Sequence, residues 1–315
     1  MALARPPSVE HMGHDHSHAD RSTNRTRLLV AIGIIGAFLL VEVVGALLSG
    51  SLSLLADAGH MFSDLTGLII ALVATVIAAR PANDRQTYGY QRAEVFAALF
   101  NGVVLTVVAV GVSIEGIRRL IEPGGPEVQG GTMLLVAVLG LAANIAAMFV
   151  LRGGAKDSIN MRGAYLEVFG DMLGSVAVII AAVVIMTTGF EKADAIASLA
   201  IAVMIAPRAF SLLRDVLRVL SQAVPADTNV AEIRAHILRT PGVVDVHDVH
   251  VWAITTGSHV FSAHVVVEPE VLSGDAGGCL LDELSECLEE HFDVAHSTFQ
   301  LEPATHAAHE DHSHA

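Results

Sequence analysis

Cysteine is scarce in this sequence: Cys279 and Cys287 are the two among 315 residues. On one helix they would lie about 12 Å apart along the axis, too far to form a disulfide. Two free thiols suit a domain in the reducing cytoplasm. The first 27 residues contain no short apolar core. We therefore expect no signal peptide and a cytoplasmic N-terminus.

Charged residues are also few. They make up 16% of the chain, against 53% hydrophobic residues and a mean hydropathy of +0.57. These values exclude an ordinary soluble protein. The apolar residues fall in six blocks near the ~20 residues that cross a bilayer as a helix. The blocks are 28–48, 52–79, 95–117, 131–151, 164–187 and 193–213, the last being interrupted by Asp194, Pro207 and Arg208.

Basic residues are scarce in the loops expected outside. Fifteen of the 18 lie in the tails and in the loops expected inside, leaving Arg118, Arg119 and Lys192 outside. This bias predicts six spans with both termini in the cytoplasm.

The segment 225–303 holds 14 acidic residues and two arginines. It should therefore bind neither nucleic acid nor anionic lipid.

Histidine is nearly absent from the apolar region, where His60 is the one histidine between Ala19 and Ala235. Asp64 follows it by four residues, so a helix places both on one face, and Glu167 and Asp171 repeat the spacing in the fifth apolar block. One imidazole and three carboxylates make a four-ligand set for a divalent metal, with zinc favoured by tetrahedral geometry. An ionisable residue at membrane depth is costly and marks a functional site.

Depth in the bilayer tests whether these pairs meet. Asp64 lies 12 residues from the outer end of its block and Asp171 seven from the inner end. At ~1.5 Å per residue these depths sum to about 28 Å, close to the ~30 Å hydrocarbon core, although the pair midpoints miss by roughly 7 Å. The alternative role for membrane polar residues is hydrogen bonding between helices. We assign it to the isolated Glu42, Glu94, Asn101, Asn144 and Asp194, and leave Asp57 undecided.

The sequence is expected to divide into four parts. Residues 1–26 are expected to form a disordered His-rich tail, 27–215 the six-span transport domain, 216–303 a cytoplasmic domain, and 304–315 a second His-rich tail. The pattern after Pro225 predicts the order αββαβ. This order indicates a small two-layer α+β domain of ferredoxin-like type.

Four motifs now indicate a family. The run from Leu55 to Asp64, LADAGHMFSD, resembles the second span of cation diffusion facilitators, and residues 161–175 resemble the fifth. The segment 88–94, YGYQRAE, is similar to the motif before the third span, and 247–252, HDVHVW, to the cytoplasmic domain. The resemblance covers about 27–303 and is nearest to the bacterial cobalt–zinc–cadmium resistance branch. Many family members have histidine where this chain has Glu167. With glutamate in place of histidine, the ligand set is harder than theirs, which should relax strict zinc preference.

This resemblance implies a homodimeric exporter in the bacterial cytoplasmic (inner) membrane. It would exchange cytoplasmic Zn²⁺, Cd²⁺ or Co²⁺ for protons, without a catalytic cofactor. It also implies a metal site, of regulatory role, in the cytoplasmic domain at His247, His264, His296 and Glu302. Histidines at every second or third position of both tails favour weak metal capture.

Two other functions remain open from the sequence. A membrane-anchored metallohydrolase would use His247, Asp248 and His250, and a metal sensor would bind ions without moving them. We treat His259, with His236 and His291, as ordinary surface residues.

Overall fold

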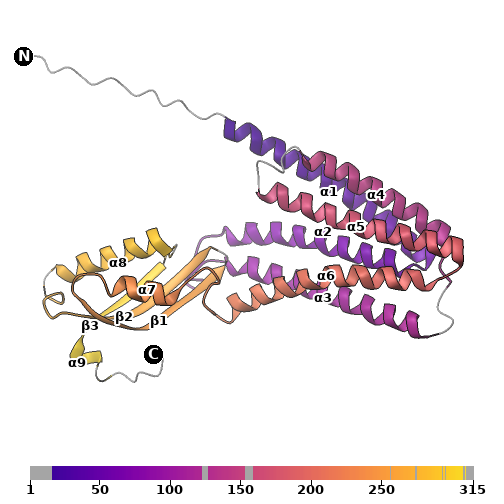
Figure 1. Cartoon of the computed structure of the whole chain (residues 1–315). Helices are drawn as coiled ribbons and strands as arrows, with labels where there is room; N and C mark the ends of the chain where they lie inside the picture. The colour runs from indigo at the N-terminus through magenta and orange to yellow at the C-terminus, as the bar shows by residue number, and fades with distance from the viewer. Residues whose placement is uncertain are drawn as a thin grey trace, which may run out of the picture. The chain divides into compact units, whose positions relative to one another are not determined.

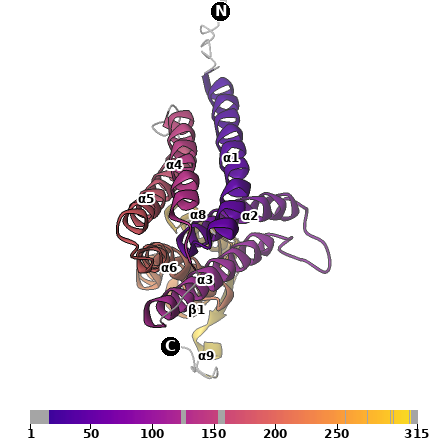
Figure 2. The same cartoon turned by 90° about the vertical axis from the view of Figure 1, so that its right-hand side faces the viewer.

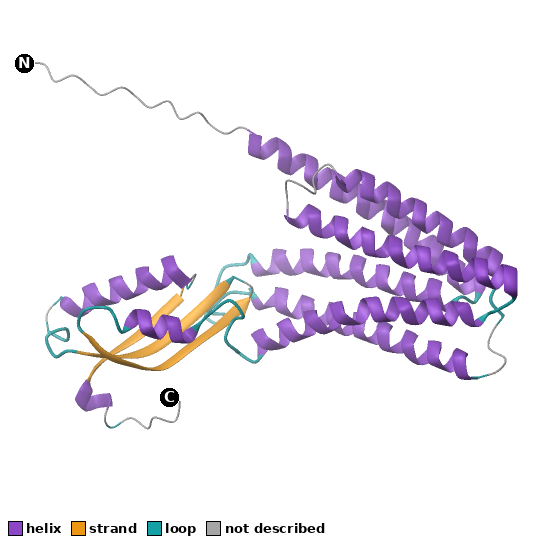
Figure 3. Ribbon diagram, in the orientation of Figure 1, coloured by secondary structure: helices purple, strands orange, loops and turns teal. Residues whose placement is uncertain are grey.

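The computed structural model describes residues 16–122, 127–152, 159–255, 257–273, 275–292, 294, 296–307 and 309 (Figures 1 and 3). Within these ranges, six helices are long and apolar enough to cross a membrane. They are followed by a small domain of helices and three strands. In chain order the elements are α1 His16–Ser49, α2 Leu52–Ala78, α3 Arg92–Ile121, α4 Gly130–Arg152, α5 Ile159–Thr188, α6 Lys192–Leu220, α7 Val230–Ile237, β1 Val243–Thr255, β2 Ser258–Val267, α8 Ala276–Phe292, β3 His296–Pro303 and α9 Ala304–Ala307.

The predicted fold class is confirmed: six apolar helices precede an α+β domain with the order αββαβ. The expectation for the N-terminal tail is corrected in part. Helix α1 begins at His16, so residues 16–26 are helical where disorder was expected. No proline or glycine interrupts 16–32, so the helix of the first span continues toward the N-terminus. Residues 1–15 and 310–315 of the tails lie outside the described residues.

The chain divides into two compact units, residues 1–65 with 107–206 and residues 66–106 with 207–315. In the first unit, α1 packs against α4 and α4 against α5, as Figures 1 and 2 show. Glycines allow close approach between α1 and α4. A Cβ atom on Gly45 would lie 2.5 Å from the Val136 side chain, and one on Gly140 would lie 2.7 Å from the Phe38 ring. Membrane helices commonly use small residues in this way because their cohesion depends on close packing.

The start of α2 is held by a carboxylate from α6. Asp194 accepts hydrogen bonds from the Oγ atoms of Ser51 and Ser53, both at 2.6 Å, and from the backbone N–H groups of Leu52 at 2.6 Å and Ser53 at 3.1 Å. A guanidinium nitrogen of Arg119 on α3 lies 3.5 Å from the same carboxylate. These first N–H groups have no partner within their own helix, so Asp194 serves as the N-terminal cap of α2 from a distant point in the sequence.

In the second unit, the three strands form one sheet in the order β1-β2-β3. Strands β1 and β2 are antiparallel, and β2 and β3 are parallel. Helices α7 and α8 contribute Ile233, Ile237, Leu284 and Leu288 to the same apolar core as Phe261 of β2. Both helices therefore cover one face of the sheet. Because side chains alternate along a strand, His264, three positions after Phe261, points to the opposite face.

Replacing Asp194 by alanine is expected to destabilise the membrane domain by about 2–4 kcal/mol, because it leaves the buried hydroxyls of Ser51 and Ser53 and the first N–H groups of α2 without their acceptor. Thermal unfolding of the protein in detergent measures the loss. Asp215→Ala is the matched control. Asp215 also lies on α6 but is exposed and paired with the exposed Arg214, so its loss should change stability by less than about 0.5 kcal/mol. Equal shifts for the two variants would contradict the capping role.

Candidate metal sites

A first group of metal-ligand side chains lies between α2 and α5. Nε2 of His60 lies 3.5 Å from Oδ2 of Asp64, one turn later on α2, and 3.3 Å from Oδ1 of Asp171 on α5. The three side chains are 14%, 15% and 5% exposed. Each offers a ligand atom within 4.8 Å of the other two. One nitrogen and two oxygens so close together can hold one divalent ion.

Packing around the group explains how the two helices come together there. A Cβ atom on Gly174, one turn after Asp171, would lie 3.1 Å from Oδ1 of Asp57. Helix α5 therefore touches the Asp57 side chain at a residue that has no side chain of its own. On α2, a Cβ atom on Gly59 would lie 3.0 Å from Val108 of α3. Glycines thus let α2 lie close to both neighbours, which brings His60 within reach of α5.

The structure does not bring Glu167 into this group. It lies half-buried on α5, one turn before Asp171, and it contributes no ligand atom to the group of three. The i,i+4 spacing correctly put Glu167 and Asp171 on one helix face. Which of them reaches the other helix depends on the axial offset between α2 and α5, and spacing within one helix carries no information on that offset.

Two further carboxyl groups lie buried nearby. Asp57 precedes His60 by three residues on α2, and Glu42 of α1 lies close to it. Both residues are at most 2% exposed. The isolated position of Glu42 in the sequence gave no indication of this pair.

A second group lies on the sheet face opposite α7 and α8. His247 of β1 pairs in register with His264 of β2, and their ring centroids are 5.2 Å apart. Glu302 of β3 is buried, with Oε1 at 2.6 Å from Nε2 of His247 and Oε2 at 3.9 Å from Nδ1 of His264. These three residues form the other close set of potential ligands in the described part of the chain.

His296 does not join this group. It begins β3 opposite Val260, is exposed, and packs edge-on against the Tyr88 ring at 6.1 Å between centroids. Six residues of strand separate it from Glu302, about 20 Å at ~3.3 Å per residue, so the two cannot bind the same ion. This spacing was readable from the sequence once both residues were assigned to one strand. A histidine that was assigned only to the tail lies closer: Nε2 of His306 is 3.8 Å from Oε2 of Glu302.

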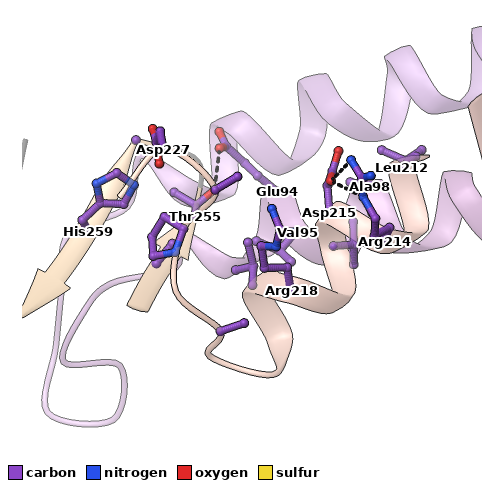
Figure 4. Close-up of a pocket in the computed structure, with 17 residues that line it drawn as sticks. Glu94, Val95, Ala98, Leu212, Arg214, Asp215, Arg218, Asp227, Thr255 and His259 are labelled. Atoms are coloured by element: carbon purple, nitrogen blue, oxygen red, sulfur yellow. Dashed lines mark hydrogen bonds and ion pairs between the residues drawn. The ribbon is translucent and has the colours of Figure 1, made fainter. Parts of the chain in front are cut away.

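A cavity of about 630 Å³ in the second unit is separate from both groups. It is lined by the first turn of α3, the end of α6 and the β1–β2 hairpin (Figure 4). Thr255 at the hairpin end donates to Oε2 of Glu94 at 3.4 Å. His259, which we expected at the surface, is buried in its wall. No close set of three metal ligands includes a residue of this cavity among the described residues.

Comparison with known proteins agrees with the order of these domains. Residues 28–221 match the cation efflux transmembrane domain, and residues 225–304 match the cytoplasmic domain of cation efflux proteins. The metal cation efflux system protein CzcD of Cupriavidus metallidurans is 42% identical, covering 93% of this chain and 91% of its own. The zinc transporter ZitB of Escherichia coli is 40% identical, over 92% and 93%.

Two other proteins are also similar. A cadmium, cobalt and zinc/H(+)-K(+) antiporter of Bacillus subtilis is 35% identical, covering 94% of this chain and 93% of its own. Among solved structures, the metal-bound C-terminal domain of the CzcD transporter is 37% identical. That match covers 24% of this chain and 99% of that one, with a TM-score of 0.22. On the matches to both domains and to full-length relatives, the chain belongs to the cation efflux family: it is a multi-pass membrane transporter of metal cations and not an enzyme.

Proposed function

We propose that this transporter exports a divalent metal, zinc first and cadmium or cobalt as well, from the cytoplasm in exchange for protons. The observation that carries the proposal is the group of His60, Asp64 and Asp171 between two apolar helices, with Asp171 buried and the other two largely so. Imidazole with carboxylates suits zinc. The names of the relatives, a zinc transporter and a cadmium, cobalt and zinc antiporter, support the same class of ion.

An ion held by these three close ligands would have one tetrahedral position left for a fourth. A transport site must release its ion, so water or a mobile side chain in the fourth position suits it better than a closed set. Glu167, one turn away on α5, is the protein group that would take this position after a small movement of the helix. With Glu167 bound, the ion would have one nitrogen and three oxygen ligands. Such a hard set should relax a strict preference for zinc.

Exchange for protons follows from competition for the ligands. Metal binding requires a neutral imidazole and ionised carboxylates, so protons and metal exclude each other. Facing the cytoplasm, the group takes up metal, and facing outward, protons displace it. The direction of movement agrees with the basic residues, which favour termini in the cytoplasm of a bacterial inner-membrane protein.

The group of His247, His264 and Glu302 is proposed as a second, regulatory metal site. Its ligands come from three neighbouring strands, so it can be closed and rigid, as structural zinc sites are. We propose that the protein works as a homodimer in which metal at this site favours one arrangement of the cytoplasmic domains. A sensor that binds metal without moving it is the alternative, and flux measurements separate the two.

His60→Ala is expected to reduce zinc uptake into proteoliposomes by at least about 100-fold, because even residues that only orient metal ligands cost 10–100-fold when lost. Zinc-dependent proton release should fall with it. His250→Ala is the matched control, since His250 is an exposed histidine on β1 outside both groups. Full zinc–proton exchange in His60→Ala would disprove the proposed site. Metal binding with no flux in the wild type would favour the sensor.

The two acidic residues of α5 should differ in importance. Asp171→Asn removes a carboxylate that lies 3.3 Å from His60, and it should abolish flux of zinc, cadmium and cobalt alike. Glu167→Gln should retain measurable zinc flux, because Glu167 is outside the close group. Glu167→His should raise the ratio of zinc to cobalt flux, since a second imidazole replaces a hard oxygen ligand. Equal losses for Asp171→Asn and Glu167→Gln would contradict this ranking.

A further inference from the structure

The C-terminal tail returns to the cytoplasmic metal group directly after the last strand. Helix α9, Ala304–Ala307, follows β3 without a loop. It places His306 one turn beyond Glu302, with Nε2 at 3.8 Å from Oε2 of the buried carboxylate. His306 is 56% exposed.

Glu302 is thereby approached by three imidazoles. Its Oε1 contacts Nε2 of His247 at 2.6 Å, and its Oε2 faces Nδ1 of His264 at 3.9 Å and Nε2 of His306 at 3.8 Å. Outside them, Asp248 lies 3.6 Å from Nδ1 of His247. In metal sites, the ring nitrogen of a histidine that does not bind the metal usually faces a carboxylate, which fixes the orientation of the ring.

Counting the ligands shows what His306 adds. His247, His264 and Glu302 supply two nitrogens and one oxygen within 4.8 Å of one another, which leaves a tetrahedral ion one position short. His306 would complete a set of three imidazoles and one carboxylate. His306 is not one of the three close ligands, but its Nε2 lies 3.8 Å from Oε2 of Glu302. It sits on a helix of four residues, so a shift of this short helix is the movement that coordination by His306 requires.

We propose that His306 is the fourth ligand of the cytoplasmic metal site, and that metal binding draws helix α9 toward Glu302. The inference rests on one part of the proposed function, namely that the group of His247, His264 and Glu302 binds a divalent metal. The bound ion would be zinc or another metal that accepts tetrahedral coordination by nitrogen and oxygen. The tail then acts as part of the site, where the sequence indicated only loose capture.

Zinc titration of the full-length protein in detergent tests the proposal. All variants carry His60→Ala, which silences the transport site. His306→Ala is expected to weaken zinc binding at the cytoplasmic site by roughly 10–100-fold, as loss of a supporting ligand does. His309→Ala is the matched control. It is an exposed histidine of the same tail, and its Nδ1 lies 2.7 Å from the carbonyl oxygen of Thr305 within its own segment. It should change affinity less than about twofold.

Cobalt substitution gives a second measurement that does not depend on affinity. Bound Co²⁺ should show the intense visible bands of a tetrahedral site with His306 present and weaker bands in His306→Ala. If His264→Ala abolishes binding while His306→Ala behaves as His309→Ala does, the role of His306 is overturned and the cytoplasmic site stands. If His264→Ala has no effect either, the cytoplasmic site itself is overturned, together with the inference.

Discussion

The carboxylate of Asp194 determines where α2 begins and how it is oriented. It accepts four hydrogen bonds from Ser51, Leu52 and Ser53 and lies beside Arg119. Each further residue turns the helix by about 100°, so a fixed first turn fixes the direction in which His60 and Asp64 point. A buried charge within a membrane protein is tolerated when it is paired. Here the pairing joins α2, α3 and α6, and the metal group depends on that junction.

The two groups contain similar metal-ligand side chains, but they are built from different secondary-structure elements. The membrane group takes two side chains from one helix and one from another, so sliding or rotating a helix changes its coordination. The cytoplasmic group takes one side chain from each of three hydrogen-bonded strands, and strand register holds its ligands at fixed positions. The first construction suits an ion that must be released, and the second suits an ion that stays bound.

Much of this arrangement was readable from the sequence. Apolar runs of about 20 residues predict six spans because the bilayer imposes that length, and alternation with turn residues predicts the αββαβ order. The pair of His60 and Asp64 followed from helical spacing, and the depth comparison pointed to Asp171 as their partner. The exclusion of Glu167 and the approach of Glu42 to Asp57 did not follow. Both depend on the offset between helices, which contacts such as those of Asp194 and Gly174 set across more than 100 residues of chain.

The contact between Gly174 and Asp57 has a consequence for how this protein can change over evolution. The space for a methyl group at position 174 is already used by the carboxylate of residue 57, at 3.1 Å from the point where a Cβ would stand. A larger residue at 174 is therefore accommodated when the side chain at 57 becomes shorter, and a longer side chain at 57 requires that 174 remain glycine. Positions 57 and 174 should vary as a pair among functional descendants of this chain, although 117 positions separate them.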